Sequence, residues 1–126
     1  ASHSFRNSER VVRMMGGQFD RHGYGTFTAE ITRADHPVTQ GLAPFETWDE
    51  TYVHKNNNPD RLVLMERADS AGREAWTWVR NQGKGRVFYT AYGHDQRTWQ
   101  QPGFHALLRN GITWAVGDAV RAQWAQ

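Results

Sequence analysis

One stretch of the chain, residues 83–95 with the sequence GKGRVFYTAYGHD, constrains the fold more than any other. Two glycines open it and mark a turn, because glycine tolerates the positive φ angles that tight turns need. Residues 86–92 then form a nearly continuous run of apolar and aromatic side chains, which predicts an internal strand covered on both faces. Open α/β sheets bind their ligands beyond the C-terminal ends of such strands. The residues that follow, His94 and Asp95, are therefore the first candidates for a functional site.

The composition indicates one domain with an aromatic core. The chain has 126 residues, of which 38% are hydrophobic and 13% aromatic, and its six tryptophans argue against disorder. The net charge is only +2 and the charges are interspersed, so nucleic acid is not indicated as a partner. No run of residues is long and apolar enough to indicate a membrane-spanning helix. Because cysteine is absent, disulfides, zinc–thiolate sites and a cysteine nucleophile are excluded within the chain.

Local patterns predict about five strands and two or three helices in a single domain over residues 1–126. Ser8 is a suitable N-cap, and a glycine pair ends the short helix that follows it. Polar loops are expected over residues 18–25 and 96–101. Strands are expected over residues 26–33, 48–54, 61–67, 75–80 and 86–92, and helices over residues 9–15 and 102–116, with a further turn at 120–124. The last two strands are joined by a short glycine-rich link, which predicts a hairpin.

The last long helix carries apolar residues at helical spacing after an initial proline. Leu107, Leu108 and Ile112 are expected to pack on a face of the sheet. Together these elements indicate an α+β chain, or part of an α/β sheet with an antiparallel edge.

Further candidates for the site are acids and histidines elsewhere in the chain. Alternation along a strand places Glu50 and His54 on one face, but roughly 13 Å apart, so they cannot share a metal ion without a bulge. His3 and His22 are expected in loops of the first segment, from which either can approach His94. For each of these residues the alternative is a solvated surface position.

The roles of the remaining candidates follow from their chemistry. His94 can act as a general base or a metal ligand, with Asp95 orienting or neutralising it. The alternative is that this pair caps the following turn. Trp48 and Trp99 can stack against a sugar ring, although core packing is the default for a tryptophan in a strand. Trp99, in the polar loop after His94, is the better binding candidate.

Several motifs together resemble those of the ThuA-like (trehalose utilisation) family. They are MGGQF followed by a histidine, HPVTQGL, FETWDETYVH, GKGRVFYTAYGHDQRTW and PGFHALLRNGITWAVGD. The resemblance covers about residues 5–118. The motifs DETYVH and TAYGHDQRTW most resemble those of ThuA-like domains in secreted, haem-binding, multi-domain dehydrogenase-type proteins of bacteria.

The resemblance implies a flavodoxin-like, three-layer α/β sheet like that of class I glutamine amidotransferases, with an antiparallel strand pair and a C-terminal helix. It implies that only the later part of the domain is present, and that the protein is secreted or periplasmic. His94 and Asp95 fall where amidotransferases keep their histidine and acid, but glutaminase chemistry is not expected without a cysteine. Because absent strands would leave a sheet edge uncovered, we expect self-association or contact with the rest of the domain.

Two classes of function remain open from the sequence. The first is a carbohydrate-related binding module, or catalytic remnant, of a larger protein, which the lack of a recognisable nucleophile favours. The alternative is an enzyme that acts on a sugar or keto-sugar, with His94, Asp95 and Glu50 as its acid/base or metal site. Imidazoles and carboxylates suit a divalent metal such as zinc, and they suit sugar hydroxyls equally well. We expect these three residues and a histidine of the first segment to line one pocket, with Trp99 at its rim.

Overall fold

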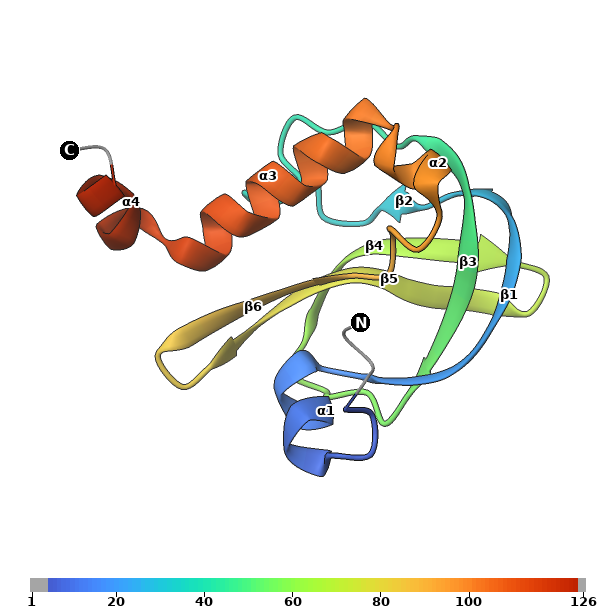
Figure 1. Ribbon diagram of the computed structural model, residues 1–126, viewed down its shortest axis with the longest axis horizontal. Coiled ribbons are helices and arrows are strands. Elements are labelled where there is room, and N and C mark those ends of the chain that lie inside the picture. The colour runs from blue at the N-terminus through green and yellow to red at the C-terminus, as the bar shows by residue number, and fades with distance from the viewer. Residues whose placement is uncertain (1–4, 125–126) are drawn as a thin grey trace.

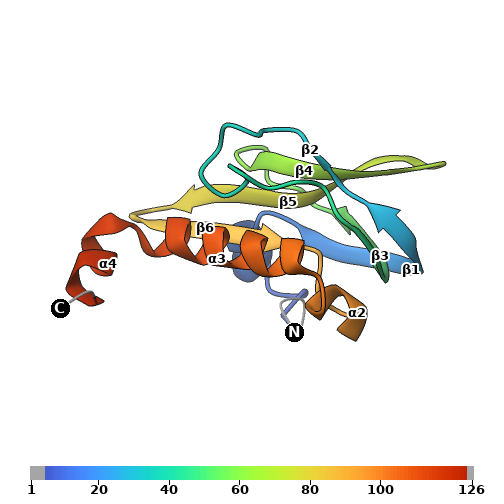
Figure 2. The same cartoon turned by 90° about the horizontal axis from the view of Figure 1, so that it is seen from above.

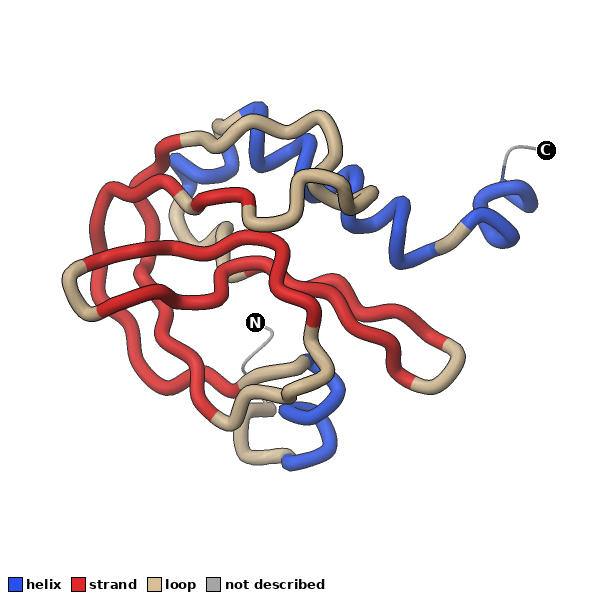
Figure 3. Tube along the Cα trace, turned by 180° about the vertical axis from the view of Figure 1, so that it is seen from behind, coloured by secondary structure: helices blue, strands red, loops and turns tan. Residues whose placement is uncertain are grey.

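Every strand pair within residues 5–124, the part of the chain that the computed structural model describes, is antiparallel (Figure 1). The elements in chain order are α1 (Glu9–Met15), β1 (Gln18–Thr28), β2 (Glu30–Ile31), β3 (Glu46–Lys55), β4 (Leu62–Asp69), β5 (Gly72–Gln82), β6 (Gly85–Thr90), α2 (Gln96–Trp99), α3 (Pro102–Val116) and α4 (Asp118–Trp124). β1 pairs with β3 in a long ribbon, and the other strands form a sheet in the order β2-β4-β5-β6. Seen from behind, the strands form a curved band with helical segments above and below it (Figure 3).

β6 is shorter and more peripheral than the sequence indicated. Among the described strands it pairs only with β5, so it is an edge strand and the prediction of an internal strand is wrong for this part of the chain. The predicted hairpin between β5 and β6 is confirmed. A flavodoxin-like sheet needs parallel pairs, and none occurs between the strands within residues 5–124, so that detail stays a prediction.

The first segment contains a confirmed helix and a wrongly predicted loop. Ser8 caps α1 by accepting a hydrogen bond from the Val11 backbone N–H at 3.5 Å, and Gly16 ends the helix with a φ of 92°. Residues 18–25, expected as a loop, belong to β1 instead. They become a strand because β3 supplies backbone partners along their length, which the polar local sequence does not indicate. The other expected loop, residues 96–101, contains the single turn of α2.

α3 packs along β6, as Figure 2 shows, but only part of its apolar stripe reaches the sheet. Leu107 is fully buried and Leu108 is half-buried, whereas the side chain of Ile112 is 58% exposed. The prediction that all three residues pack on the sheet is therefore wrong for Ile112. Gly111 allows the close approach of the helix, because a Cβ atom there would lie 2.3 Å from the ring of Phe88.

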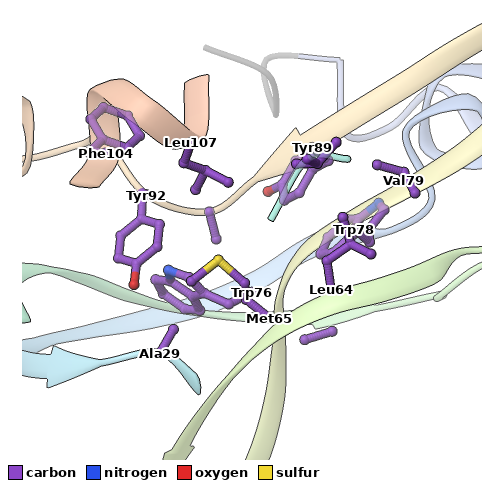
Figure 4. Close-up of a cluster of buried hydrophobic side chains, with 13 residues drawn as sticks. Ala29, Leu64, Met65, Trp76, Trp78, Val79, Tyr89, Tyr92, Phe104 and Leu107 are labelled. Atoms are coloured by element: carbon purple, nitrogen blue, oxygen red, sulfur yellow. The ribbon is translucent and has the colours of Figure 1, made fainter. Parts of the chain in front are cut away.

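The core is aromatic, as the composition indicates, and Figure 4 shows its centre. Trp76 and Trp78 of β5 are fully buried. The ring of Tyr89 stacks on Trp78 with centroids 3.9 Å apart, and the ring of Tyr92 meets Trp76 edge-on at 5.7 Å. No helix within residues 5–124 is both long and apolar enough to cross a lipid bilayer.

Candidate functional site

A buried carboxylate, Asp49 of β3, shapes the loop that carries His94. Its Oδ2 accepts hydrogen bonds from the Gly93 backbone N–H at 2.8 Å and from the Thr98 hydroxyl at 2.7 Å. Its Oδ1 accepts from the Asp95 backbone N–H at 2.8 Å. Because Asp49 is fully buried, these bonds to a charged acceptor are shielded from water and fix the loop firmly.

The next residue of β3, Glu50, faces the other way and meets two histidines. Nε2 of His94 lies 3.2 Å from Oε1 of Glu50, and Nδ1 of His22 lies 3.6 Å from the same oxygen. The Glu50 side chain is 8% exposed, whereas that of His94 is 58% exposed. The three groups therefore form a recessed carboxylate with an accessible imidazole beside it. We call His22, Glu50 and His94 the Glu50 site.

A bulge in β1 brings His22 to this site. The register of β1 against β3 shifts at Asp20, and beyond the shift His22 lies opposite Tyr52. Side chains alternate along a strand, so without the extra residue Arg21 would lie opposite Tyr52 in place of His22. Burial and a hydrogen bond with Glu50 raise the pKa of the Tyr52 phenol, so Tyr52 stays neutral beside the carboxylate.

Asp95 does not act on His94 in the way the sequence suggested. Its carboxylate caps α2 by accepting from the Arg97 backbone N–H at 2.9 Å, and it accepts two further hydrogen bonds from the Arg97 guanidinium at 2.7 and 3.0 Å. This guanidinium holds the pKa of Asp95 at about 2, well below its usual range. Asp95 therefore caps the following turn, as the alternative interpretation has it. The carboxylate beside His94 is that of Glu50.

Aromatic rings lie next to the Glu50 site on the same ribbon. Tyr24 is opposite Glu50 in register and 62% exposed, and its ring stacks on Trp48 with centroids 5.7 Å apart. The Arg97 guanidinium lies 3.8 Å from the centroid of the Trp48 ring. The Trp48 ring thus lies between Tyr24 and Arg97, and Tyr24 is the more accessible of the two aromatic side chains. Trp99 is exposed, and its indole N–H donates to the Gly93 carbonyl at 2.9 Å.

Another predicted site residue, His54, has partners other than Glu50. His54 is buried: its Nδ1 is 2.9 Å from Glu74 Oε1 and its Nε2 is 3.0 Å from the Tyr89 hydroxyl. His54 and Glu50 therefore have separate partners, as their spacing along the strand indicated. His3 lies outside the described residues. Within residues 5–124, no group of three or more His, Cys, Asp and Glu side chains is arranged to hold a metal ion.

Sequence reasoning missed Asp49, Tyr24 and Arg97. Alternation along a strand places Asp49 on the face opposite Glu50, but no local signal distinguishes a buried aspartate that holds a loop from a solvated one. Tyr24 and Arg97 lay in segments expected to be loops. The one available hint was Asp95 itself, because an aspartate at the start of a turn is a preferred N-cap residue.

The comparisons with known proteins agree with this architecture. The family model of ThuA, described as trehalose utilisation, matches residues 1–115. The crystal structure of a ThuA-like protein from Bacteroides uniformis ATCC 8492 matches with a TM-score of 0.73 and 22% identity, over 86% of this chain and 51% of that one. A ThuA-like protein from Parabacteroides merdae ATCC 43184 matches with a TM-score of 0.75 and 18% identity, over 90% of this chain and 57% of that one.

The chain thus spans about half the length of these solved structures, and at such identities the likeness shows the fold alone. No curated protein matches the chain. The match to the family model extends over nearly the whole sequence, and the chain therefore belongs to the ThuA (trehalose utilisation) family.

Proposed function

We propose that this chain is a carbohydrate-binding module and that its ligand is a neutral, sugar-like polyol bound at the Glu50 site. One observation carries the proposal: the recessed Glu50 carboxylate lies 3.2 Å from the accessible His94 imidazole and beside the exposed ring of Tyr24. Carboxylates and imidazoles form strong hydrogen bonds with hydroxyl groups. An exposed tyrosine ring offers an apolar face for the C–H side of a sugar.

The arrangement of charges around the site favours a neutral ligand. The Arg97 guanidinium is paired with Asp95, and the Glu50 carboxylate lies between the imidazoles of His22 and His94. Within residues 5–124, each cationic group at this site therefore has an acidic neighbour, and no cation is left to bind an anionic ligand. The family description, trehalose utilisation, is consistent with a sugar. The resemblance of DETYVH and TAYGHDQRTW to ThuA-like domains of multi-domain dehydrogenase-type proteins supports a place for the module in a larger protein.

Calorimetry against a panel of neutral sugars, with trehalose included, tests the proposal. We expect at least one sugar to bind and Glu50→Gln to weaken that binding by about tenfold or more, because a hydrogen bond to a charged group is replaced by a weaker neutral one. Glu46→Gln is the matched control, since it makes the same change on an exposed residue of β3. Equal affinity of Glu50→Gln and the unmodified chain would reject the Glu50 site as the binding site.

The second candidate function is an enzyme acting on a sugar or keto-sugar. The closeness of Nε2 of His94 to Glu50 favours it, because a carboxylate that stabilises an imidazolium makes the histidine a better general base. A product assay on the bound sugar separates the two functions. Turnover that His94→Ala abolishes would support the enzyme, and binding without turnover would support the module.

A further inference from the structure

A cavity lies where β1 begins and β3 ends, next to α1. Its volume is about 780 Å³, which is in the range of sites for small organic ligands. Gln18, the first residue of β1, lines it, whereas His22 of the Glu50 site lies four residues further along the strand. Four strand residues span roughly 13 Å, and none of the described residues that line the cavity belongs to the Glu50 site, so the two are separate.

Among the described residues that line the cavity, one cationic group has no acidic partner within residues 5–124. Arg6, Arg13 and Glu9 all line it, and Arg13 pairs with Glu9 at 2.9 Å. Within residues 5–124, no carboxylate pairs with the Arg6 guanidinium, which lies 5.8 Å from the centroid of the Phe19 ring. A guanidinium binds a carboxylate through two parallel hydrogen bonds, so Arg6 can accept one anionic group from a ligand.

Carboxamides form much of the remaining wall and are held in place by hydrogen bonds. The Gln18 amide donates to the Arg6 carbonyl at 2.6 Å, and the Asn56 amide donates to Gln18 Oε1 at 2.6 Å. The Asn58 amide donates to the Arg13 carbonyl at 3.1 Å. Each of these groups keeps a further donor or acceptor that can serve ligand hydroxyls.

The apolar part of the wall completes the chemistry of the cavity. Val12 and Pro59 line it together with the carboxamides. A wall that combines carboxamides with apolar side chains matches a polyol, which has hydroxyl edges and C–H faces. We propose that this cavity binds a sugar acid, that is, a polyol carrying a single carboxylate, and that Arg6 is its anion-binding residue.

Glucuronate and glucose differ only in the carboxylate and are the probes for this site. Titration of the ¹⁵N-labelled chain with glucuronate is expected to shift the backbone signals of Arg6, Asn7 and Asn58, while glucose at equal concentration shifts them far less. Arg6→Gln is expected to weaken glucuronate binding by about tenfold to a hundredfold, because the charge-assisted pair is lost. Arg10→Gln, on the exposed surface of α1 and away from the cavity wall, is the control and is expected to leave the affinity unchanged.

Glu50→Gln separates this proposal from the first one. Glucuronate affinity is expected to survive that change, because Glu50 is not among the described residues that line the cavity. Loss of glucuronate binding in Glu50→Gln, equal binding of glucose and glucuronate, or full affinity in a folded Arg6→Gln chain would each overturn the proposal. The absence of any glucuronate-dependent shift up to tens of millimolar would overturn it as well.

Discussion

Replacing Asp49 by asparagine tests how the loop that carries His94 is held. Asp49 is fully buried and accepts four hydrogen bonds, from the backbone N–H groups of Glu50, Gly93 and Asp95 and from the Thr98 hydroxyl. Asparagine has nearly the same shape but keeps only one acceptor oxygen. The change therefore removes charge and acceptor capacity without leaving a cavity.

The structure indicates which of these bonds is lost. If the asparagine oxygen faces Glu50 and Asp95, its amide faces Gly93 and Thr98. The Thr98 hydroxyl can rotate to accept from that amide and donate to the Thr47 hydroxyl, which is 3.0 Å away. The Gly93 N–H cannot accept, so it loses its partner. One lost hydrogen bond to a charged acceptor and the weakening of the others give an expected destabilisation of about 2–4 kcal/mol.

Urea denaturation and amide hydrogen exchange measure the two parts of this prediction. We expect a lower free energy of unfolding and, under native conditions, faster exchange at Gly93 than at Asp95. Glu46→Gln, on an exposed position of the same strand, is expected to change the stability by less than about 0.5 kcal/mol. A loss below about 0.5 kcal/mol for Asp49→Asn, with unchanged exchange at Gly93, would refute the reasoning, since a buried charged acceptor contributes more than that.

Three further predictions concern the core, the loop and the sheet edge. Leu107→Ala is expected to lower the free energy of unfolding, measured by urea denaturation, by about 2–5 kcal/mol because Leu107 is fully buried. Ile112→Ala is expected to lower it by less than about 1 kcal/mol because Ile112 is exposed. Equal losses would contradict the packing of α3. The Asp95 carboxyl is expected to titrate by NMR with a pKa of about 2, and Arg97→Gln to move it towards 3.8. The pKa of Asp95 is lower in the folded chain than in the unfolded one, so the Asp95–Arg97 pair stabilises the fold fully above the unfolded pKa, and this stabilisation is lost as the pH falls towards 2. An Asp95 titration without this shift would show that the pair does not form in solution. β6 is an edge strand among the strands within residues 5–124, and this edge and the exposed Ile112 favour self-association. Light scattering that shows a monomer throughout the micromolar range would contradict this prediction.

Features that depend on neighbouring residues could be predicted from the sequence. The α1 helix follows from the Ser8 cap and the Gly16 stop, and α3 from its initial proline and apolar spacing. The β5–β6 hairpin follows from two apolar runs joined by a short glycine-rich link. In each case the deciding interactions lie within a few residues, so the local sequence contains the information. The opposite orientations of Asp49 and Glu50 also follow from local alternation along a strand.

Features that depend on distant partners could be decided only by the tertiary structure. The strand that carries His22 forms because β3 pairs with it, and the bulge at Asp20 sets which of its side chains face Glu50. Asp49 and the loop it holds are 44 to 49 residues apart in sequence. The partner of His94 was predicted from adjacency to be Asp95, but Arg97 engages that carboxylate and Glu50 lies closer to the imidazole. Strand register, burial and ion-pair choice all result from contacts between segments that become neighbours only when the chain folds.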